Sequence, residues 1–359
     1  MKASDLVIFL LFFLSFTISV QSQPSPDATA MQALKDSLRN PTILGWSDPD
    51  PCQWSHVKCS QNKRVTHIQI SNQNLSGSLP LDLRNLSSLT VLEVADNQLS
   101  GPIPSLSGLS SLQELAFDKN NFSYMPPDFF KGLESLQSIS LDYNPLSSWE
   151  IPASLKDAMG LRSFSANQAG LSGTIPDFLG GDTFPGLIHL HLAINNLEGQ
   201  IPWSFSKSSI QTLWLNGQAS NTKLNGSLSV LQNMTSLTQL WLHRNLFTGP
   251  LANFSRLSSL EDLELRDNTL TGIVPRSLIN LPKLNTVSLT NNLLQGPTPK
   301  FNISKIKVDM RTGSNSFCSD DPGVPCDGQV NILLSVAESM GYPMVFSESW
   351  KGNNAFLRR

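Results

Sequence analysis

The chain has 359 residues, a formal net charge of −3 and four cysteines. This charge gives no argument for binding nucleic acid or an acidic membrane surface, because both partners favour a basic face. The sequence contains no phosphate-binding G-x-x-x-x-G-K-[ST] or G-x-G-x-x-G motif, no H-E-x-x-H and no G-x-S-x-G. Without a nucleophile and base constellation, nothing indicates an enzyme or a cofactor.

The first element is a predicted secretory signal at residues 1–22. Lys2 precedes an apolar stretch over residues 6–16, and small or compact residues precede Gln23. This apolar run is shorter than the ~20 residues that a membrane-spanning helix needs. We therefore expect cleavage near Ser22 and a mature chain without a membrane segment, in an oxidising extracellular compartment.

The dominant feature is an apolar pattern that recurs about every 24 residues. The pattern L-x-x-L-x-L-x-x-N-x-L-x-G-x-I-P fits residues 89–104 without a gap. Its first apolar position occurs at Val65, Leu89, Leu112, Leu136, Leu161, Leu187, Ile210, Leu237, Leu260 and Leu284. Such a period is typical of a leucine-rich-repeat solenoid, whose units stack on their neighbours. We predict ten repeats over residues 65–307, with a parallel sheet on the concave face.

An asparagine in each repeat is predicted to turn inward and bond backbone groups of the adjacent coil. This asparagine is present as Asn97, Asn120, Asn144, Asn195, Asn245, Asn268 and Asn292. Gln73, Ala169 and Gln218 replace it, and we expect Ala169 to break the ladder locally. The L-x-G-x-I-P tail resembles the plant-specific class of repeats, which implies a second short strand and a 3₁₀ turn on the convex side. The fourth repeat slips near Trp149, and the extra residues 219–222 of the seventh are expected in a loop.

The four cysteines form two close pairs, one on each side of the repeats. Cys52 and Cys59 lie in a predicted N-terminal cap over residues 23–64, and Cys318 and Cys326 lie in a C-terminal cap and linker over residues 308–347. We predict the disulfides Cys52–Cys59 and Cys318–Cys326, which would close both ends. Zinc would need all four thiols together, yet the pairs are separated by a stack about 50 Å long at ~4.8 Å per strand. No metal site is expected.

Exposed strand residues can be compared as columns, because equivalent positions in successive repeats lie ~4.8 Å apart. The column between the second and third apolar positions holds small residues in repeats three to five and becomes bulky from repeat six. Two adjacent tryptophans, expected to be exposed and framed by charged residues and histidines, have the composition of an interface hot spot. The predicted partner-binding surface comprises His189, His191, Trp214, Trp241, His243, Arg244, Glu264 and Arg266. Alternatively, these aromatic residues only stiffen the sheet through cross-strand pairing.

His189 and His191 share one strand face, ~6.6 Å apart. We do not predict a metal site there. Protonation at the acidic pH of a cell wall is instead expected to tune binding of a carboxylate-bearing surface.

Seven N-x-[ST] sequons are candidate glycosylation sites. They occur at Asn74, Asn85, Asn121, Asn225, Asn233, Asn253 and Asn302. We expect most of them to carry glycans, which would keep the glycosylated flanks from serving as partner surfaces.

Several segments resemble a known family of receptors. Residues 31–59, with Trp46 and DPCQW at 50–54, resemble the cap of plant leucine-rich-repeat receptors. NMTSL at 233–237, TNNLLQGPTP at 290–299, NSFC at 315–318 and VAESMGYP at 336–343 resemble the ectodomain of the transmembrane kinase (TMK) family of receptor-like kinases. This resemblance runs from about residue 28 to residue 353. It implies full-length plasma-membrane serine/threonine kinases in auxin signalling and cell expansion, whose ectodomains work with secreted auxin-binding cupin proteins.

The end of the chain departs from that family. Residues 348–353 resemble the opening of a second cysteine cap, but Phe356 stands where the first cap places its cysteine, six residues after the tryptophan. We therefore predict an unfinished second cap over residues 348–359, cut before the family's second repeat block, membrane helix and kinase.

The resemblance and the repeats together predict an extracellular binding module similar to a receptor-kinase ectodomain. Its expected partner is an extracellular protein, with auxin-binding cupin proteins or a co-receptor as candidates, and it needs no cofactor. We expect secretion to the apoplast, or a position on the outer side of the plasma membrane within a receptor. The alternative is a secreted wall inhibitor similar to polygalacturonase-inhibiting proteins.

Overall fold

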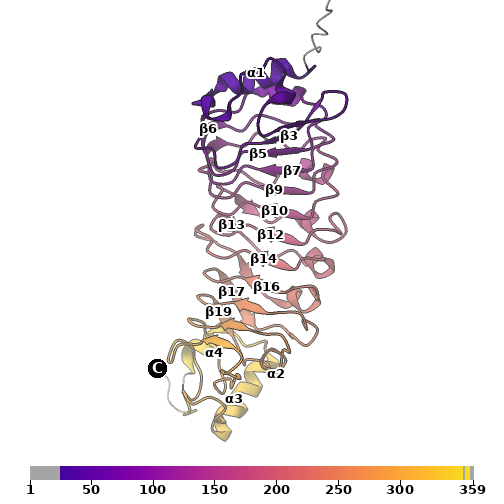
Figure 1. Cartoon of the computed structure of the whole chain (residues 1–359). Coiled ribbons are helices and arrows are strands. Elements are labelled where there is room, and N and C mark those ends of the chain that lie inside the picture. The colour runs from indigo at the N-terminus through magenta and orange to yellow at the C-terminus, as the bar shows by residue number, and fades with distance from the viewer. Residues whose placement is uncertain (1–24, 351, 356–359) are drawn as a thin grey trace, which may run out of the picture.

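The computed structural model describes residues 25–350 and 352–355. The predicted signal at residues 1–22 lies outside the described residues, as do residue 351 and the last four residues of the predicted second cap. The chain forms an elongated stack of coils, with helix α1 (Ala28–Ser37) at one end and helices α3 (Gly328–Ser339) and α4 (Met344–Ser349) at the other (Figure 1). This confirms the leucine-rich-repeat solenoid.

One twelve-stranded sheet runs along the described solenoid. Its first pair is antiparallel, and every later pair is parallel. The strands in spatial order are β2 (Val57–Cys59), β3 (Val65–Gln69), β5 (Val91–Glu93), β7 (Glu114–Ala116), β9 (Ser138–Ser140), β10 (Ser163–Ser165), β12 (His189–His191), β14 (Thr212–Trp214), β16 (Gln239–Trp241), β18 (Asp262–Glu264), β20 (Thr286–Ser288) and β21 (Lys307–Asp309).

The sheet contains one parallel strand more than the ten predicted repeats supply. β21 pairs with β20 in register, so the parallel sheet continues across the predicted boundary at residue 307. Asn315 then occupies a further ladder position, because its amide donates to the Leu289 carbonyl and accepts from the Leu294 N–H. The coil was not predicted because its apolar positions no longer follow the full repeat pattern.

The opposite side of the coils carries short strands and 3₁₀ turns, as the plant-specific repeat predicts. The strands are β1 (Leu38–Arg39), β4 (Ser76–Gly77), β6 (Gln98–Pro102), β8 (Asn121–Tyr124), β11 (Ser172–Thr174), β13 (Asn196–Glu198), β15 (Asn225–Gly226), β17 (Leu246–Pro250) and β19 (Thr269–Thr271). The turns include η3 (Leu81–Asn85), η4 (Ala153–Asp157), η5 (Asp177–Leu179), η6 (Trp203–Lys207) and η7 (Ser229–Asn233). A short helix, α2 (Arg276–Ile279), takes this place in a later coil.

Repeating leucines and the asparagine ladder fill the space between the two sides. The apolar positions of the repeats are buried in one continuous cluster. Each ladder asparagine bonds backbone groups of its own and the preceding coil; Asn97, for example, donates to the Ile70 and Val94 carbonyls. Gln218 makes the same kind of bonds, to the Leu192 and Leu215 carbonyls. Backbone groups that would be buried without partners are thereby satisfied.

The two irregular repeats are accommodated without interrupting the sheet. Ala169 lacks an amide, but its carbonyl accepts a hydrogen bond of 2.7 Å from the indole N–H of Trp149, and β9 and β10 still pair in register. The extra residues 219–222 form a loop before the bridge between Gly199 and Leu224. This confirms that the insertion is placed outside the stacked strand.

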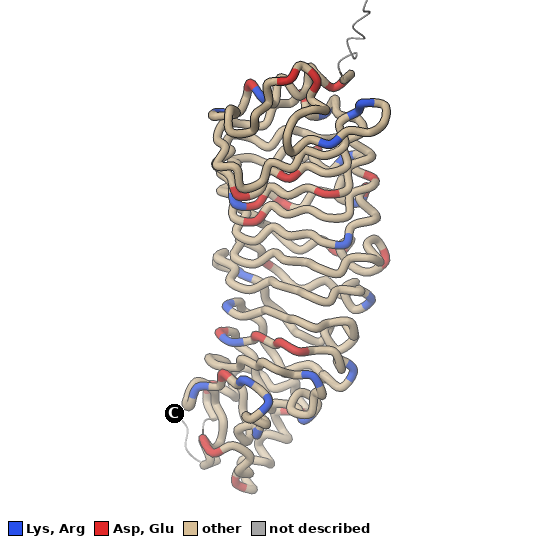
Figure 2. Tube along the Cα trace, viewed as in Figure 1, with Lys and Arg blue, Asp and Glu red and all other residues tan. Residues whose placement is uncertain are grey.

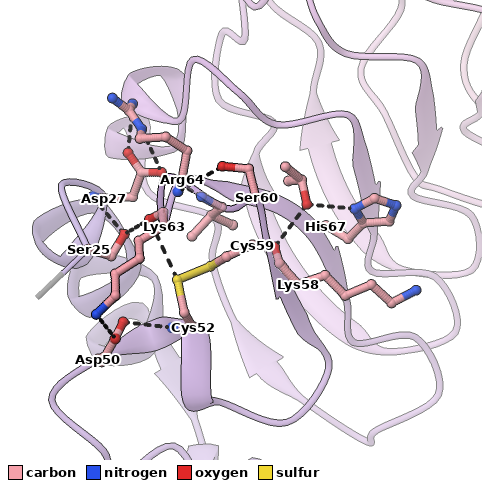
Figure 3. Close-up of a disulfide and its surroundings, with 12 residues drawn as sticks. Ser25, Asp27, Asp50, Cys52, Lys58, Cys59, Ser60, Lys63, Arg64 and His67 are labelled. Carbon is pink, nitrogen blue, oxygen red and sulfur yellow. Dashed lines mark hydrogen bonds and ion pairs between the residues drawn. A yellow bond between two sulfur atoms is a disulfide. The ribbon is translucent and has the colours of Figure 1, made fainter. Parts of the chain in front are cut away.

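The predicted Cys52–Cys59 disulfide closes a loop within the N-terminal cap, and a buried carboxylate joins the cap to the first repeat (Figure 3). The Asp27 side chain accepts from the Val65 N–H at 2.7 Å and pairs with Arg64 at 2.8 Å. Trp46 and Trp54 stack beneath α1 with ring centroids 4.6 Å apart. The cap thus shields apolar surface that the first coil would otherwise expose.

The C-terminal end contains the second predicted disulfide, Cys318–Cys326. The loop between α3 and α4 approaches the solenoid, where the Thr271 hydroxyl donates to the Tyr342 carbonyl. The Tyr342 ring lies so close to Gly272 that a β-carbon there would come within 2.9 Å of it. None of the helices in the described part of the chain is both long and apolar enough to cross a membrane.

Candidate functional site

The sheet brings the predicted surface residues into register across four neighbouring strands. His191, Trp214, Trp241 and Glu264 are successive partners on β12, β14, β16 and β18. His189, Thr212, Gln239 and Asp262 form the adjacent column of the same strands. The column analysis therefore placed His191, Trp214, Trp241 and Glu264 correctly with respect to one another.

Three of the side chains form an aromatic stack along the sheet. The rings of His191 and Trp214 are 3.8 Å apart, and those of Trp214 and Trp241 are 4.4 Å apart, each pair inclined by 10°. The Trp214 indole donates to Gln239, and the Trp241 indole donates to Asp262 at 2.9 Å. Both tryptophans are half-buried, contrary to the expectation of exposed rings, because each ring covers part of its neighbour. The stacking also agrees with the alternative that they stiffen the sheet.

An open hollow begins where the aromatic stack ends. It has a volume of about 410 Å³ and is lined by Trp241, His243, Glu264, Arg266, Thr286, Lys307 and Asp309. Four of these residues belong to the predicted surface. We call this feature the Trp241 hollow.

Residues of both charge signs line the Trp241 hollow. Acidic and basic residues are also distributed along the solenoid as a whole (Figure 2). Arg266 lies 3.9 Å from Glu264 and 3.0 Å from Asp267. Burial raises the pKa of Glu264, and the nearby carboxylates of Asp262 and Asp309 raise it further, against a hydrogen bond from Ser288 and the charge of Arg266. The carboxylate of Glu264 is therefore incompletely compensated.

Several buried polar atoms beside the aromatic stack have no hydrogen-bond partner within the described chain. They include Asn216 Oδ1, His243 Nδ1 and Asp262 Oδ1. Buried polar atoms in folded proteins are normally hydrogen-bonded, so these unpaired ones carry a desolvation cost at this part of the sheet.

The other predicted residues lie away from the Trp241 hollow. Arg244 projects at the edge of the sheet, with 64% of its side chain exposed, and lies 3.8 Å from Asp267. His189 lies at the far end of the stack, where its Nδ1 is 2.9 Å from the Thr212 hydroxyl. The eight residues therefore form a row rather than one pocket.

Three residues of the hollow, Thr286, Lys307 and Asp309, were not predicted. Lys307 and Asp309 lie on β21, which carries no recognisable repeat and so was not included in the columns. Spacing was the one available signal for this strand. Asp309, which accepts a hydrogen bond from Ser288, follows it by 21 residues, and this separation is close to the repeat period.

His191 does not provide the predicted response to mild acid. The Thr212 hydroxyl lies 2.7 Å from His191 Nε2 and also contacts His189. Burial, with a smaller contribution from His189, lowers the pKa of His191 to about 4. Burial and the charges of Arg266 and Arg244 lower the pKa of His243 to about 4 as well. The protonation hypothesis is therefore wrong for His191, which stays neutral at the mildly acidic pH of a wall.

These lowered pKa values predict a loss of stability in acid. The unfolded chain has ordinary histidine pKa values near 6.5, so between about pH 6.5 and pH 4 it binds more protons than the folded chain. Stability from this source is fully present above pH 6.5 and is lost as the pH falls towards 4. After allowance for partial exposure we expect on the order of 1 kcal/mol from each of His191 and His243. Urea unfolding from pH 7 to 4.5 should show a shallower pH dependence in His191→Gln and His243→Gln; an unchanged slope would contradict this assignment.

All seven sequons lie outside the strands of the main sheet. Asn85 and Asn233 belong to η3 and η7, Asn121 and Asn225 to β8 and β15, and the remaining three to loops. Glycans at these positions would leave the concave column residues uncovered. Their occupancy stays a prediction.

The fold and this surface define a leucine-rich-repeat protein with a concave face suited to binding. Sequence families agree with this class: the leucine rich repeat N-terminal domain matches residues 24–60 and 326–355, and leucine rich repeat families match residues 104–146 and 259–281. The second match to the N-terminal domain covers α3 and α4 and begins before the predicted second cap at residues 348–359.

Similar curated proteins include receptor-like kinases. The chain is 51% identical to the receptor-like kinase TMK2 of Arabidopsis thaliana over 96% of its own length, and 42% identical to TMK4 of the same plant over 98%. The chain is thus similar over nearly its whole length to part of these receptor-like kinases, as the sequence motifs indicated. It spans 39% of the length of TMK2 and 36% of that of TMK4.

A solved receptor structure is also similar to this chain in fold. The Arabidopsis thaliana receptor kinase HAESA, in complex with the peptide hormone IDA and the co-receptor SERK1, superposes with a TM-score of 0.68 at 29% sequence identity. The match covers 81% of this chain and 50% of that of HAESA.

Proposed function

We propose that this chain is the ligand-recognition part of a receptor and that it binds an extracellular protein or peptide on the concave face of repeats six to nine. The observation that carries the proposal is the aromatic stack that ends at the Trp241 hollow. Tryptophans and arginines clustered near the centre of a surface are typical of interface hot spots.

The comparisons favour a receptor over the alternative of a wall inhibitor. The relatives reported above are receptor-like kinases, and HAESA binds a peptide hormone and a co-receptor. By this analogy and by the TMK resemblance, auxin-binding cupin proteins and a co-receptor are the candidate partners, in auxin-type signalling. This role includes secretion after removal of residues 1–22, glycosylation at the sequons, and action in the apoplast or at the outer face of the plasma membrane.

We expect Trp214→Ala and Trp241→Ala each to weaken partner binding by about 30-fold or more, the effect of a hot-spot truncation of about 2 kcal/mol. Because both rings are half-buried and stacked, the alanine variants also lose some stability. Trp241→Phe retains an aromatic ring and serves as the milder variant. Surface plasmon resonance of the secreted ectodomain against recombinant auxin-binding cupin protein, a co-receptor ectodomain and polygalacturonase provides the measurement.

The matched control for this experiment is Trp203→Ala. Trp203 begins η6, away from the main sheet, and is 59% exposed. Its replacement should leave the affinity unchanged. Unaltered affinity in both concave-face variants, or tight binding to polygalacturonase alone, would reject the proposed function.

A further inference from the structure

The Trp241 ring has one covered face and one open face. Trp214 stacks on the side towards β14, and it is the single ring neighbour of Trp241 among the described residues. On the other side, β18 and β20 present Glu264 and then Ser288 in the same column. Ser288 is small and buried, so no side chain of that strand reaches up to cover the ring. The open face of Trp241 therefore forms a wall of the hollow.

Carboxylates lie beside that open face. Glu264 is the direct cross-strand partner of Trp241, and Asp309 lines the hollow from β21. The nearest cation to Glu264 is Arg266, but its closer contact is with Asp267, at 3.0 Å compared with 3.9 Å. Glu264 has only 22% of its side chain exposed, so water compensates little of its charge. A further cation beside Glu264 would be stabilised by this half-buried negative charge.

Hydrogen-bonding capacity in the hollow also favours a donor. The ionised carboxylates of Glu264 and Asp309, which line it, can only accept hydrogen bonds. Lysine supplies three N–H donors and arginine five, and neither can accept a hydrogen bond. Both cations are also attracted to the face of a tryptophan ring, arginine with the additional benefit of planar stacking.

An anionic ligand fits the same hollow less well. Lys307 is exposed and would attract a carboxylate, yet Arg266 is already paired with two acidic residues. A carboxylate in contact with Trp241 would also lie near Asp262, Glu264 and Asp309, whose charges would repel it. The position over the ring therefore selects a cation.

We infer that the Trp241 hollow binds a lysine or arginine side chain of the partner protein or peptide, stacked on the open face of Trp241 and paired with Glu264. This inference rests on the proposed function and specifies its chemistry. The basic side chain continues the aromatic column beyond Trp241, where Glu264 and then Ser288 carry no ring.

Short peptide amides test this inference directly. Acetyl-Gly-Arg-Gly-amide, its citrulline analogue and its glutamate analogue are titrated into the secreted, glycosylated chain at low salt, with tryptophan fluorescence and calorimetry as readouts. Citrulline matches arginine closely in shape but has no charge. We expect the arginine peptide to bind about tenfold more tightly than the citrulline peptide, consistent with a partly desolvated cation–π contact and ion pair.

Variants identify the site of this preference. Glu264→Gln removes the charge with little change in shape, and it should reduce the preference for arginine to less than twofold. Glu93→Gln is the matched control, because Glu93 occupies the same column on β5 and also faces the concave side. Equal binding of the arginine and citrulline peptides, preference for the glutamate peptide, no binding of any peptide, or an effect of Glu93→Gln equal to that of Glu264→Gln would each overturn the inference.

The two proposals can fail separately. If partner capture requires Trp214 and Trp241 but the peptides show no charge preference, the inference is wrong and the proposed function stands. If the peptides bind as expected but neither tryptophan replacement changes the affinity for the partner, the proposed function is wrong.

Discussion

Replacement of Asn195 by alanine is expected to lower the free energy of unfolding by on the order of 3–5 kcal/mol. The Asn195 amide nitrogen donates to the Ala166 and Leu192 carbonyls, and its oxygen accepts from the N–H groups of Ala169 and Leu171. Asn195 is 2% exposed, so water cannot replace these bonds. Alanine would leave at least two buried N–H groups and one carbonyl without partners, each at a cost of roughly 1–3 kcal/mol.

The effect should be local as well as global, because solenoid repeats contact only their neighbours. We expect faster hydrogen exchange over residues 166–171 and 192–197, together with a lower urea midpoint. Asn196→Ala is the matched control: Asn196 is the next residue, its side chain is exposed, and its replacement should change stability by about 0.5 kcal/mol or less.

A second comparison comes from the chain itself. Gln218 makes ladder bonds to the Leu192 and Leu215 carbonyls and to the Leu197 N–H, so a longer amide is compatible with this position. Asn195→Gln should therefore be less damaging than Asn195→Ala. If alanine and glutamine variants lose the same stability, the loss does not come from the ladder bonds.

The solenoid fold could be predicted because the same apolar pattern recurs along the chain, so each repeat indicates the fold again. Ten coils carry the same apolar spacing, and each inward position must be apolar or a bonded amide if the coil is to stack. The extra strand β21 escaped prediction because the terminal coil has one stacked neighbour in the sheet and is covered by the C-terminal helices, which relaxes its pattern. Asn315 retained the ladder function, but a single asparagine is a weak signal without the leucines around it.

The candidate site was predicted in part, for a physical reason. Column positions follow from strand register alone, so the neighbours Trp214 and Trp241 could be assigned. Their degree of burial depends on ring rotamers, which the sequence pattern does not specify, and so the exposed rings were predicted wrongly. The neutral state of His191 depends in turn on that stacking, because the adjacent indole removes water from the imidazole.

Asp27→Ala is expected to destabilise the N-terminal cap by about 3 kcal/mol, because it breaks a buried, charge-assisted bonding network. The side chain of Asp27 is 2% exposed. It accepts hydrogen bonds from Arg64 and from the backbone N–H of Val65, the first residue of β3 (Figure 3). Arg64 keeps 31% of its side chain exposed and can rehydrate, whereas Val65 is fully buried. Most of the cost therefore comes from the unpaired Val65 N–H and the lost attachment of α1 to the sheet.

Graded variants separate these two contributions to cap stability. Asp27→Asn keeps an acceptor for Val65 but loses the charge facing Arg64, so we expect roughly half the loss seen with alanine. Asp36→Ala is the control, because Asp36 also lies on α1 but is exposed. Within the described residues 25–350 and 352–355, its side chain bonds only Gln32 of the same helix. Hydrogen exchange over residues 28–37 and 65–69 should accelerate in the Asp27 variants and stay unchanged in the control. Equal protection in Asp27→Ala and Asp36→Ala would show that the Cys52–Cys59 disulfide and the Trp46–Trp54 stack hold the cap without the carboxylate.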